Sequence, residues 1–293
     1  GMWRVSAIAD AGGWQHDTIT EDADLSYRAQ LKGWRGVYLK DLVVPAELPV
    51  DVNAFKSQQH RWAKGNAQVI RKMMKTILLS KESLHTKAEC WFHLTANCNY
   101  LLMVVLSVIM VPAMIFRAGT APHILLLTDG PFFLLNAVSV GLYFGLSQRE
   151  VHNNKHWLSR MKYIPALMSL GIGLCLNQTQ AVLEGFFTDD IEFKRTPKLG
   201  VDAHGRGPAS HTACAYKVPK SVLTFLELAF ALYYFAAVLV SIYIRRWASV
   251  PFLWLFFSGF AYISVMSLAD VRLFRELARK ELKDADPVTR LVQ

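Results

Sequence analysis

The sequence predicts an α/β segment followed by a membrane-embedded α-helical part. Of its 293 residues, 53% are hydrophobic, and the formal net charge is +9. Several long stretches contain no Asp, Glu, Lys or Arg, namely residues 90–116, 130–148, 163–183 and 247–269. A membrane-spanning helix needs about 20 mostly apolar residues, so the pattern excludes a soluble globular protein. The first quarter of the chain is polar, and we expect the chemistry there.

Residues 1–52 carry the α/β pattern. Gly12-Gly13 indicates a turn. Residues 21–32 have apolar side chains at helical spacing, and Gly33 is placed to end that helix. Residues 34–44 are rich in β-branched and aromatic side chains, which predicts two short strands. Since domains usually contain about 100–150 residues, we expect this segment to pack either on another part of the protein or on the membrane part.

Residues 53–79 have a helical pattern that is apolar on one stripe and basic beside it. The expected stripe contains Phe55, Trp62, Ala63, Val69, Ile70, Met73 and Ile77. Such a helix before a hydrophobic span is predicted to lie on the anionic cytosolic leaflet; a calmodulin-like or nucleic-acid-binding helix is the weaker alternative. Residues 53–89 contain eight basic residues against Glu82 and Glu89, which places them in the cytosol by the positive-inside rule.

The charges of the loops predict four spans, one interfacial helix and a cytosolic tail. If residues 163–187 formed a span, the basic loop at 189–220 would face outside, so we expect them to lie at the interface. The predicted organisation begins with a catalytic segment (1–52), basic interfacial helices (53–89) and a first span pair (90–148). An interfacial helix with a loop (149–220), a second span pair (221–269) and a charged tail (270–293) follow.

Cysteine and histidine spacing predicts neither a disulfide nor a metal site. Three of the four cysteines lie in apolar stretches, as small buried apolar residues do (Cys90, Cys98 and Cys175, with Cys214 outside them). His152 and His156 have i, i+4 spacing, but no acidic or Cys partner is near in sequence. We expect both histidines to be solvated.

Three short stretches carry candidate functional residues. Thr20-Glu21-Asp22 places two carboxylates at a helix start, where the helix dipole alone would also favour them. Residues 58–62 place an amide, a guanidinium and an indole within about one and a half helical turns. A guanidinium suits a diphosphate, and an indole face suits a sugar ring, although any interfacial helix has such residues. Residues 192–198 form a basic loop, which the positive-inside rule would also explain.

Together the three stretches resemble the motifs of the membrane-integrated family 2 glycosyltransferases, the cellulose-synthase-like group. The Thr-Glu-Asp motif of that family is matched by Thr20, Glu21 and Asp22. Its Gln-x-x-Arg-Trp motif is matched by Gln58, Arg61 and Trp62. Its gating loop resembles the stretch with Phe193, Arg195, Thr196, Pro197 and Lys198. The resemblance covers nearly the whole chain.

The resemblance implies roles for these residues. Asp22 would be the general base that takes a proton from an acceptor hydroxyl, so that the hydroxyl attacks a nucleotide sugar with inversion; Thr20 and Glu21 would support it. Gln58 and Arg61 would contact the donor diphosphate, where charge grows as it leaves. Trp62 would stack on the acceptor sugar, and the loop at 193–198 would close over the nucleotide.

The resemblance also implies a fold, partners and a cofactor. Residues 1–52 would be the C-terminal part of a GT-A catalytic domain. The partners would be a UDP- or GDP-hexose, a glycan or glycolipid acceptor and the lipid bilayer, without nucleic acid, in a multi-pass protein of a cell inner membrane with its catalytic part cytosolic. In this family a divalent metal (Mg or Mn) is bound by an Asp-x-Asp upstream of the first motif. We therefore expect its ligands to lie outside this chain, and the isolated chain to be inactive.

Two other classes of function stay open at this point. A non-catalytic pseudo-enzyme, or an assembly or translocation subunit of a polysaccharide synthase, would also lack the Asp-x-Asp. A transporter would use Glu227 as an intramembrane charge. We expect Glu227 to reach water instead, because it lies within about two helical turns of the interface.

Overall fold

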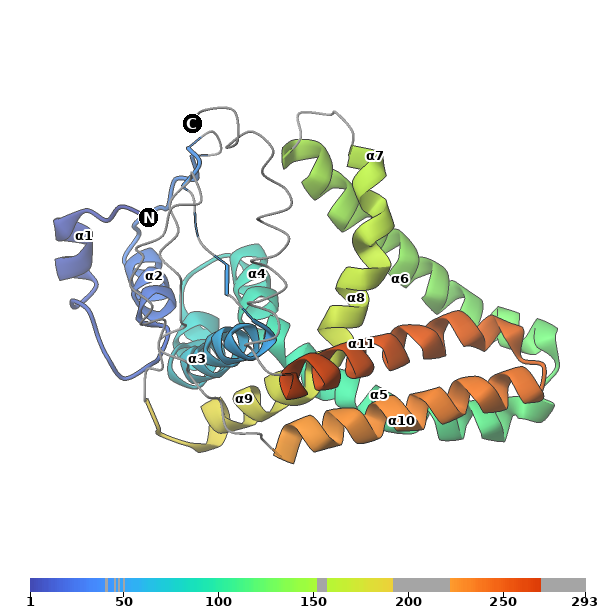
Figure 1. Ribbon diagram of the computed structural model, residues 1–293. Helices are drawn as coiled ribbons and strands as arrows, with labels where there is room; N and C mark the ends of the chain where they lie inside the picture. The colour runs from blue at the N-terminus through green and yellow to red at the C-terminus, as the bar shows by residue number, and fades with distance from the viewer. Residues whose placement is uncertain are drawn as a thin grey trace, which may run out of the picture. The chain divides into compact units, whose positions relative to one another are not determined.

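The computed structural model describes residues 1–39, 42–44, 46, 48–49, 51–151, 157–191 and 222–269 (Figure 1). Their regular structure is helical. The chain divides into two compact units. Unit 1 comprises Gly1–Asn97, Gln180–Phe225 and Ser264–Gln293; unit 2 comprises Cys98–Thr179 and Leu226–Ile263. Each unit is described by itself below.

Unit 1 is built around the longest helix in it, α3 (Val52–Leu79). The helix begins where the Asp51 carboxylate accepts a hydrogen bond from the Ala54 amide at 2.8 Å, and it ends at Ser80. Helix α4 (Leu84–Thr95) follows and is capped in the same way by Ser83. The apolar core between them contains Tyr27, Val69, Met73, Met74, Ile77 and Leu94. The prediction of a helix at 53–79 is confirmed.

The apolar stripe predicted for α3 is partly wrong. Ala63, Val69, Met73 and Ile77 are buried as expected, but Trp62 is 47% exposed. Three polar residues are buried on this helix instead, namely Lys56, Lys64 and Gln68. The reason is that α3 packs against polar segments of the same unit, so its inner face is not purely apolar.

The first part of unit 1 contains α1 (Val5–Asp10) and α2 (Glu21–Leu31). Gly12 and Gly13 have φ angles of +85° and +76°, which confirms the predicted turn. Gly33 has a φ of +89° just beyond α2, in the left-handed conformation that ends a helix. The helix predicted at 21–32 is therefore confirmed, whereas the six-residue α1 was not predicted.

The two strands predicted at 34–44 are not found in the described residues of that range. Val37, Tyr38 and Val43 are 83%, 88% and 81% exposed. A lone two-stranded hairpin is at best marginally stable in water, and these side chains bury too little surface to stabilise one. β-branched residues thus give strands only where a sheet or helix covers them. The α/β character of this segment, and hence the GT-A fold, stays a prediction.

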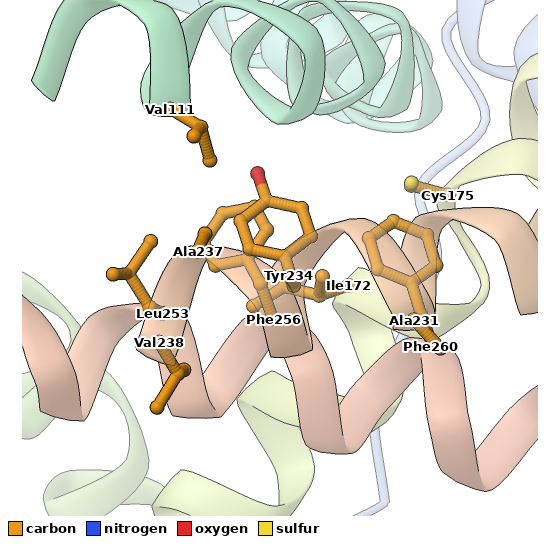
Figure 2. Packing of buried hydrophobic residues seen from close by; sticks show 10 residues of the cluster. All are labelled: Val111, Ile172, Cys175, Ala231, Tyr234, Ala237, Val238, Leu253, Phe256 and Phe260. Carbon is orange, nitrogen blue, oxygen red and sulfur yellow. The ribbon is translucent and has the colours of Figure 1, made fainter. Parts of the chain in front are cut away.

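Unit 2 contains α5 (Asn99–Phe116), α6 (Pro122–Val151), α7 (Trp157–Arg160), α8 (Ile164–Gly173) and parts of α9 (Cys175–Phe187), α10 (Val222–Tyr243) and α11 (Val250–Leu268). Its core contains an aromatic stack (Figure 2). The centroid of the Tyr234 ring lies 4.9 Å from that of the Phe256 ring and 5.9 Å from that of the Phe260 ring. The Tyr234 hydroxyl points toward the helix that carries Val111 and donates to the Ser107 carbonyl at 2.9 Å. Both ends of this tyrosine are therefore satisfied.

Helices α8 and α11 cross at glycines within unit 2. A Cβ atom on Gly259 would lie 2.2 Å from the Ser169 carbonyl oxygen, and one on Gly173 would lie 2.3 Å from the Gly259 carbonyl oxygen. Only residues without a side chain permit this approach. Ser169 and Ser258 add a hydrogen bond at 2.9 Å beside the crossing. Such small-residue contacts are typical of helix packing in membranes.

Four helical stretches of the described chain are long and apolar enough to cross a membrane: Leu84–Gly119, His123–Val151, Val222–Tyr243 and Trp247–Leu268. Each of these stretches overlaps one of the four predicted spans, and helices of this length and apolarity are typical of a multi-pass membrane protein. The single interfacial helix expected at 163–187 is two helices, α8 and α9, of the pair Trp157–Gly173 and Cys175–Phe187, bent by 49°. Its place at the membrane interface stays a prediction.

The expectation that Glu227 reaches water, which rested on its position in the sequence, is wrong. Its side chain has no exposed surface in unit 2. Distance from the end of an apolar stretch therefore does not decide whether a side chain is exposed.

Candidate functional site

The Thr20-Glu21-Asp22 stretch forms the start of α2, with Thr20 as the N-cap residue. Glu21 and Asp22 are exposed, and an Asp22 oxygen accepts a hydrogen bond from the Ala23 amide at 2.8 Å. The helix dipole favours two carboxylates here. Because Asp22 is also open to solvent, its second oxygen can reach a bound molecule. The position of Asp22 at a helix start is therefore compatible with a chemical role for its carboxylate.

Gln58, Arg61 and Trp62 lie along the first half of α3. Gln58 and Arg61 are partly buried, and Trp62 is nearly half exposed. Residues three apart lie on the same side of a helix, so the amide and the guanidinium share one surface. The indole next to them offers an exposed face, as stacking on a sugar ring requires.

A close contact at Gly65 brings the first two motifs together. A Cβ atom there would lie 2.4 Å from Thr20 Cγ2 and 2.6 Å from Thr20 Oγ1, so only glycine fits. Gly65 is one helical turn beyond Arg61. The first motif therefore packs against α3 beside the second. The third predicted stretch, with Phe193, Arg195, Thr196, Pro197 and Lys198, lies outside the described residues.

Gln68 connects two segments to the same side of α3. Its side-chain oxygen accepts a hydrogen bond from the Ile19 amide at 2.9 Å. Its side-chain nitrogen donates to the Asp190 carbonyl at 3.3 Å. Gln68 is 2% exposed, and its bond to Ile19 is buried, whereas its bond to Asp190 is partly buried.

The acidic end of α9 is paired with α3. Lys64, whose side chain is 6% exposed, contacts Asp190 at 3.0 Å and Glu184 at 3.6 Å. The His60 Nε2 atom lies 3.0 Å from the same Glu184 oxygen, Oε2, that Lys64 contacts. Gly185 permits the approach, since a Cβ atom there would lie 2.4 Å from the Lys64 carbonyl oxygen. The α3 and α9 segments are therefore joined by both charge and close packing.

Burial alone would raise the pKa of the Glu184 carboxyl. Hydrogen bonds from His60 and Gln180 and the charge of Lys64 outweigh that effect and hold its pKa below the ordinary 4.5. The carboxylate is therefore the form that this contact stabilises.

Two acidic residues beyond α9 pair with basic residues of α3. Asp189 contacts Arg71 at 2.6 Å, and Asp190 contacts Lys64 at 3.0 Å. The basic residues of α3 were expected to face anionic lipid, but Lys64, Arg71 and Lys72 pair with carboxylates of unit 1. Partners more than a hundred residues away cannot be read from helical periodicity.

Lys72 anchors the loop before α2. Its ammonium lies 2.8 Å from an Asp17 oxygen and 2.9 Å from an Asp24 oxygen. The buried Asp24 also pairs with Arg28, at 2.8 Å. Burial would raise the pKa of Asp17, but the hydrogen bond from Lys72 and its charge lower it. These contacts fix both ends of the segment that contains Thr20.

A cavity of about 390 Å³ adjoins these residues. It is lined by Asp17, Thr18, Gln68, Arg71, Lys72, Asp189 and Ile191. The two basic groups in its wall are each paired with a carboxylate there, at 2.8 Å for Lys72 with Asp17 and 2.6 Å for Arg71 with Asp189. The wall therefore has no excess of either charge.

No group of three or more His, Cys, Asp or Glu side chains that could bind a metal ion occurs in the part of the chain that the structure describes. The described residues therefore do not fit the divalent metal that the resemblance implies. The described cysteines, Cys90, Cys98 and Cys175, form no disulfide. His152 and His156 lie outside the described residues.

Sequence reasoning missed Lys64, Gln68 and Glu184. One signal was available: Lys64 and Gln68 are one turn apart within a face that otherwise contains Ala63, Ala67 and Val69. Two polar residues in an apolar face indicate polar partners, because buried polar groups are hydrogen-bonded. The identity of those partners was not visible in the sequence.

Comparison with known proteins finds one family model and a set of plant enzymes. The model for the glycosyl transferase family group 2 matches residues 2–146. Glucomannan 4-beta-mannosyltransferase 2 of Arabidopsis thaliana is 31% identical over 253 residues, which is 80% of this chain and 43% of the relative. Glucomannan 4-beta-mannosyltransferase 1 of Oryza sativa subsp. japonica is 46% identical over 103 residues, 35% of this chain and 19% of the relative.

The chain thus covers less than half the length of these curated relatives. No solved structure matches it. The matched residues of the family model include both the Thr20–Asp22 stretch and Gln58–Trp62.

Proposed function

The chain belongs to the glycosyl transferase family group 2, and from this we propose that the protein transfers a hexose, in particular mannose, from a nucleotide sugar to a growing β-linked glycan. The relatives named as mannosyltransferases support the choice of sugar. The four apolar helices support reaction at a membrane. The excess of basic residues at 53–89 supports a cytosolic location for the site.

The observation that carries the proposal is the contact of Thr20 with Gly65. It packs the segment that bears Asp22 against the helix that bears Gln58, Arg61 and Trp62. A carboxylate, a guanidinium and an indole on adjoining surfaces are the groups that glycosyl transfer needs. The alternative of a solvated acidic helix start would not require that contact.

In the proposed reaction Asp22 acts as the general base. Its exposed carboxylate accepts the proton of an acceptor hydroxyl, whose oxygen forms a bond to the anomeric carbon as the bond to the diphosphate breaks. Attack opposite the leaving group inverts the configuration. Thr20 packs on α3 and so fixes where Asp22 stands, and Glu21 shares the same first helical turn.

Arg61 and Gln58 bind the leaving diphosphate in this proposal. A guanidinium donates to two oxygens at once and keeps its charge, so it stabilises the negative charge that grows as the bond breaks. Trp62 presents its exposed indole face to the acceptor sugar. The divalent metal of the family has no described ligands here, and no step is assigned to it.

The test is transfer by the full-length protein in membranes, with GDP-mannose and UDP-glucose supplied separately. We expect a mannosyl product that a β-mannanase degrades. If the protein transfers sugar from neither donor, the result would favour the alternative of a non-catalytic subunit of a polysaccharide synthase.

Replacing the base gives the sharper result. We expect Asp22→Asn to lower the transfer rate about 10²–10⁴-fold, because it removes general base catalysis, while donor binding measured by calorimetry stays unchanged. Glu82→Gln, at an exposed carboxylate outside the site, is the matched control and should keep full activity. An Asp22→Asn enzyme with more than half the normal rate contradicts the assignment.

A further inference from the structure

We propose that Gln68 is a positioning residue for this reaction, one that sets where Asp22 stands relative to Arg61 and Trp62. The inference rests on the proposed function for its effect on rate, but the contact itself can be tested without activity. Gln68 lies outside both motifs.

Both ends of the Gln68 side-chain amide form hydrogen bonds. The oxygen of Gln68 accepts from the Ile19 amide at 2.9 Å, and its nitrogen donates to the Asp190 carbonyl at 3.3 Å. Ile19 directly precedes Thr20. A side chain that accepts from one segment and donates to another must carry both functions, and an amide does so without charge. A hydrophobic or carboxylate side chain cannot make both bonds.

The hydroxyl groups on either side of Ile19 do not hold this part of the segment, whose two ends are fixed by Lys72. The hydroxyl oxygens of Thr18 and Thr20 are buried and have no hydrogen-bond partner among the described residues. They therefore do not anchor the segment. Between them, the Ile19 amide is fixed by Gln68. An unpaired amide at this buried place would cost free energy, so the bond holds the backbone in register.

The chain is tightly packed around the bond between Gln68 and Ile19. Gly65 is one turn before Gln68 on α3, and it lies so close to Thr20 that a Cβ atom would clash. The segment cannot move toward α3, and the bond to Gln68 keeps it from moving away or sliding along the helix. Asp22 follows two residues after Thr20, at the start of a rigid helix. A shift at Ile19 is thus passed on to the Asp22 carboxylate.

The consequence for catalysis is a loss of rate with little loss of binding. Misplacing a reacting group by about 1 Å can cost about 10²-fold in rate. The donor contacts assigned to Gln58 and Arg61 lie on α3 itself, so they do not depend on where the Ile19 segment stands. We therefore expect kcat to fall while the KM for the donor changes little.

The experiment compares three variants of the full-length protein in membranes or nanodiscs. Gln68→Met keeps the side-chain volume and removes both bonds. Gln68→Glu keeps the acceptor for Ile19 and removes the donor to Asp190. Asn66→Met makes the same amide-to-thioether change two residues away on α3, and it is the control. Hydrogen exchange of the peptide containing Ile19 reports the contact directly, and steady-state kinetics report kcat and KM.

For Gln68→Met we expect exchange at Ile19 to rise at least about fivefold, as loss of one net hydrogen bond predicts. We expect kcat to fall tenfold or more, with the donor KM within twofold and the exchange of the α3 amides unchanged. Gln68→Glu should keep the protection of Ile19 and recover most of kcat. Asn66→Met should resemble the unchanged protein in both measurements.

Two results overturn the proposal. Unchanged exchange at Ile19 in Gln68→Met would show that the bond does not anchor the segment. Faster exchange with unchanged kcat would show that the anchor does not position the base. If the unchanged protein transfers no sugar, the proposed function fails, and the exchange measurements then decide alone whether Gln68 fixes the segment.

Discussion

The two units of the protein are stabilised in different ways. Unit 1 buries three charged or polar side chains on its central helix, and each has a polar partner: Lys56 with Ser267, Lys64 with Asp190 and Gln68 with Ile19. Unit 2 packs aromatic rings around Tyr234 and brings two helix backbones together at Gly173 and Gly259 (Figure 2). One unit depends on particular partners, whereas the other depends on shape and apolarity.

The difference teaches where function can arise. An apolar core tolerates exchange of one hydrophobic residue for another of similar volume. A buried polar contact fails when either partner changes. The candidate site lies in the unit of the second kind, and the same pairs that fold it also fix the positions of its motifs.

The largest effect that would test this contrast is expected for Asp24→Asn. The Asp24 side chain has no exposed surface and pairs with both Arg28 and Lys72. Its loss leaves two cations without their shared partner, and breaking a buried ion pair costs about 3–5 kcal/mol. We expect about 3 kcal/mol, because both cations are partly exposed. Hydrogen exchange in detergent should rise in the peptides of α2 and α3 and stay unchanged in those of unit 2.

The control for that experiment is Asp10→Asn. Asp10 is exposed and accepts a hydrogen bond from the Trp34 indole at 2.9 Å. Surface substitutions usually stay within about 0.5 kcal/mol, so exchange should hardly change. Equal effects of the two substitutions would mean that buried charge pairs do not stabilise unit 1, and the contrast between the units would be lost.

The next largest effect is expected in unit 2. Gly259→Ala would place a Cβ atom 2.2 Å from the Ser169 carbonyl oxygen, a backbone atom that cannot turn aside. Overpacking costs about 1–3 kcal/mol, and thermal unfolding in detergent should show a lower midpoint. The control is Gly171→Ala on α8, the partner helix of this crossing, where nothing lies within 4 Å of the added Cβ; it should be neutral or slightly stabilising. A midpoint unchanged by Gly259→Ala would refute the close crossing.

The contrast also explains what could be predicted from the sequence. Apolar spans and the helix at 53–79 were predictable because hydrophobic periodicity is a local property, and the end of α2 was predictable from Gly33. Thr20, Asp22, Arg61 and Trp62 were assigned from their resemblance to family motifs, and their roles stay proposals. None of this required knowledge of contacts between distant residues.

The contacts that place the motifs were not predictable. Lys64 and Asp190 are 126 positions apart, and Ile19 and Gln68 are 49 apart. Helical periodicity assigned Trp62 to the buried stripe, because it counts only residues of the same helix. The predicted strands at 34–44 failed for a related reason: strands form only when another segment covers them.

The smallest effect is expected from acid. The pKa values of Asp17 and Glu184 lie below their ordinary values of 3.8 and 4.5, so the folded state stabilises the ionised form of both groups. Their contribution to stability is present above the ordinary values and is lost as the pH falls through the lower values of the folded state. Both groups are partly exposed, so we expect less than about 1 kcal/mol in total.

Pepsin cleavage between pH 2 and 5, mapped by mass spectrometry, would locate this loss. The described ends of α3 and α9 in unit 1 should become sensitive first, because the contacts of Asp17 with Lys72 and of Glu184 with Lys64 weaken when these two carboxylates are protonated. The ten core residues of unit 2 in Figure 2 contain no group that titrates in this range, so their peptides should stay protected. Glu184→Gln should make unit 1 sensitive already at pH 5, since its carboxylate is then absent at every pH. If that variant and the unchanged protein are cleaved at the same pH, the charge pairs of unit 1 do not govern its acid response.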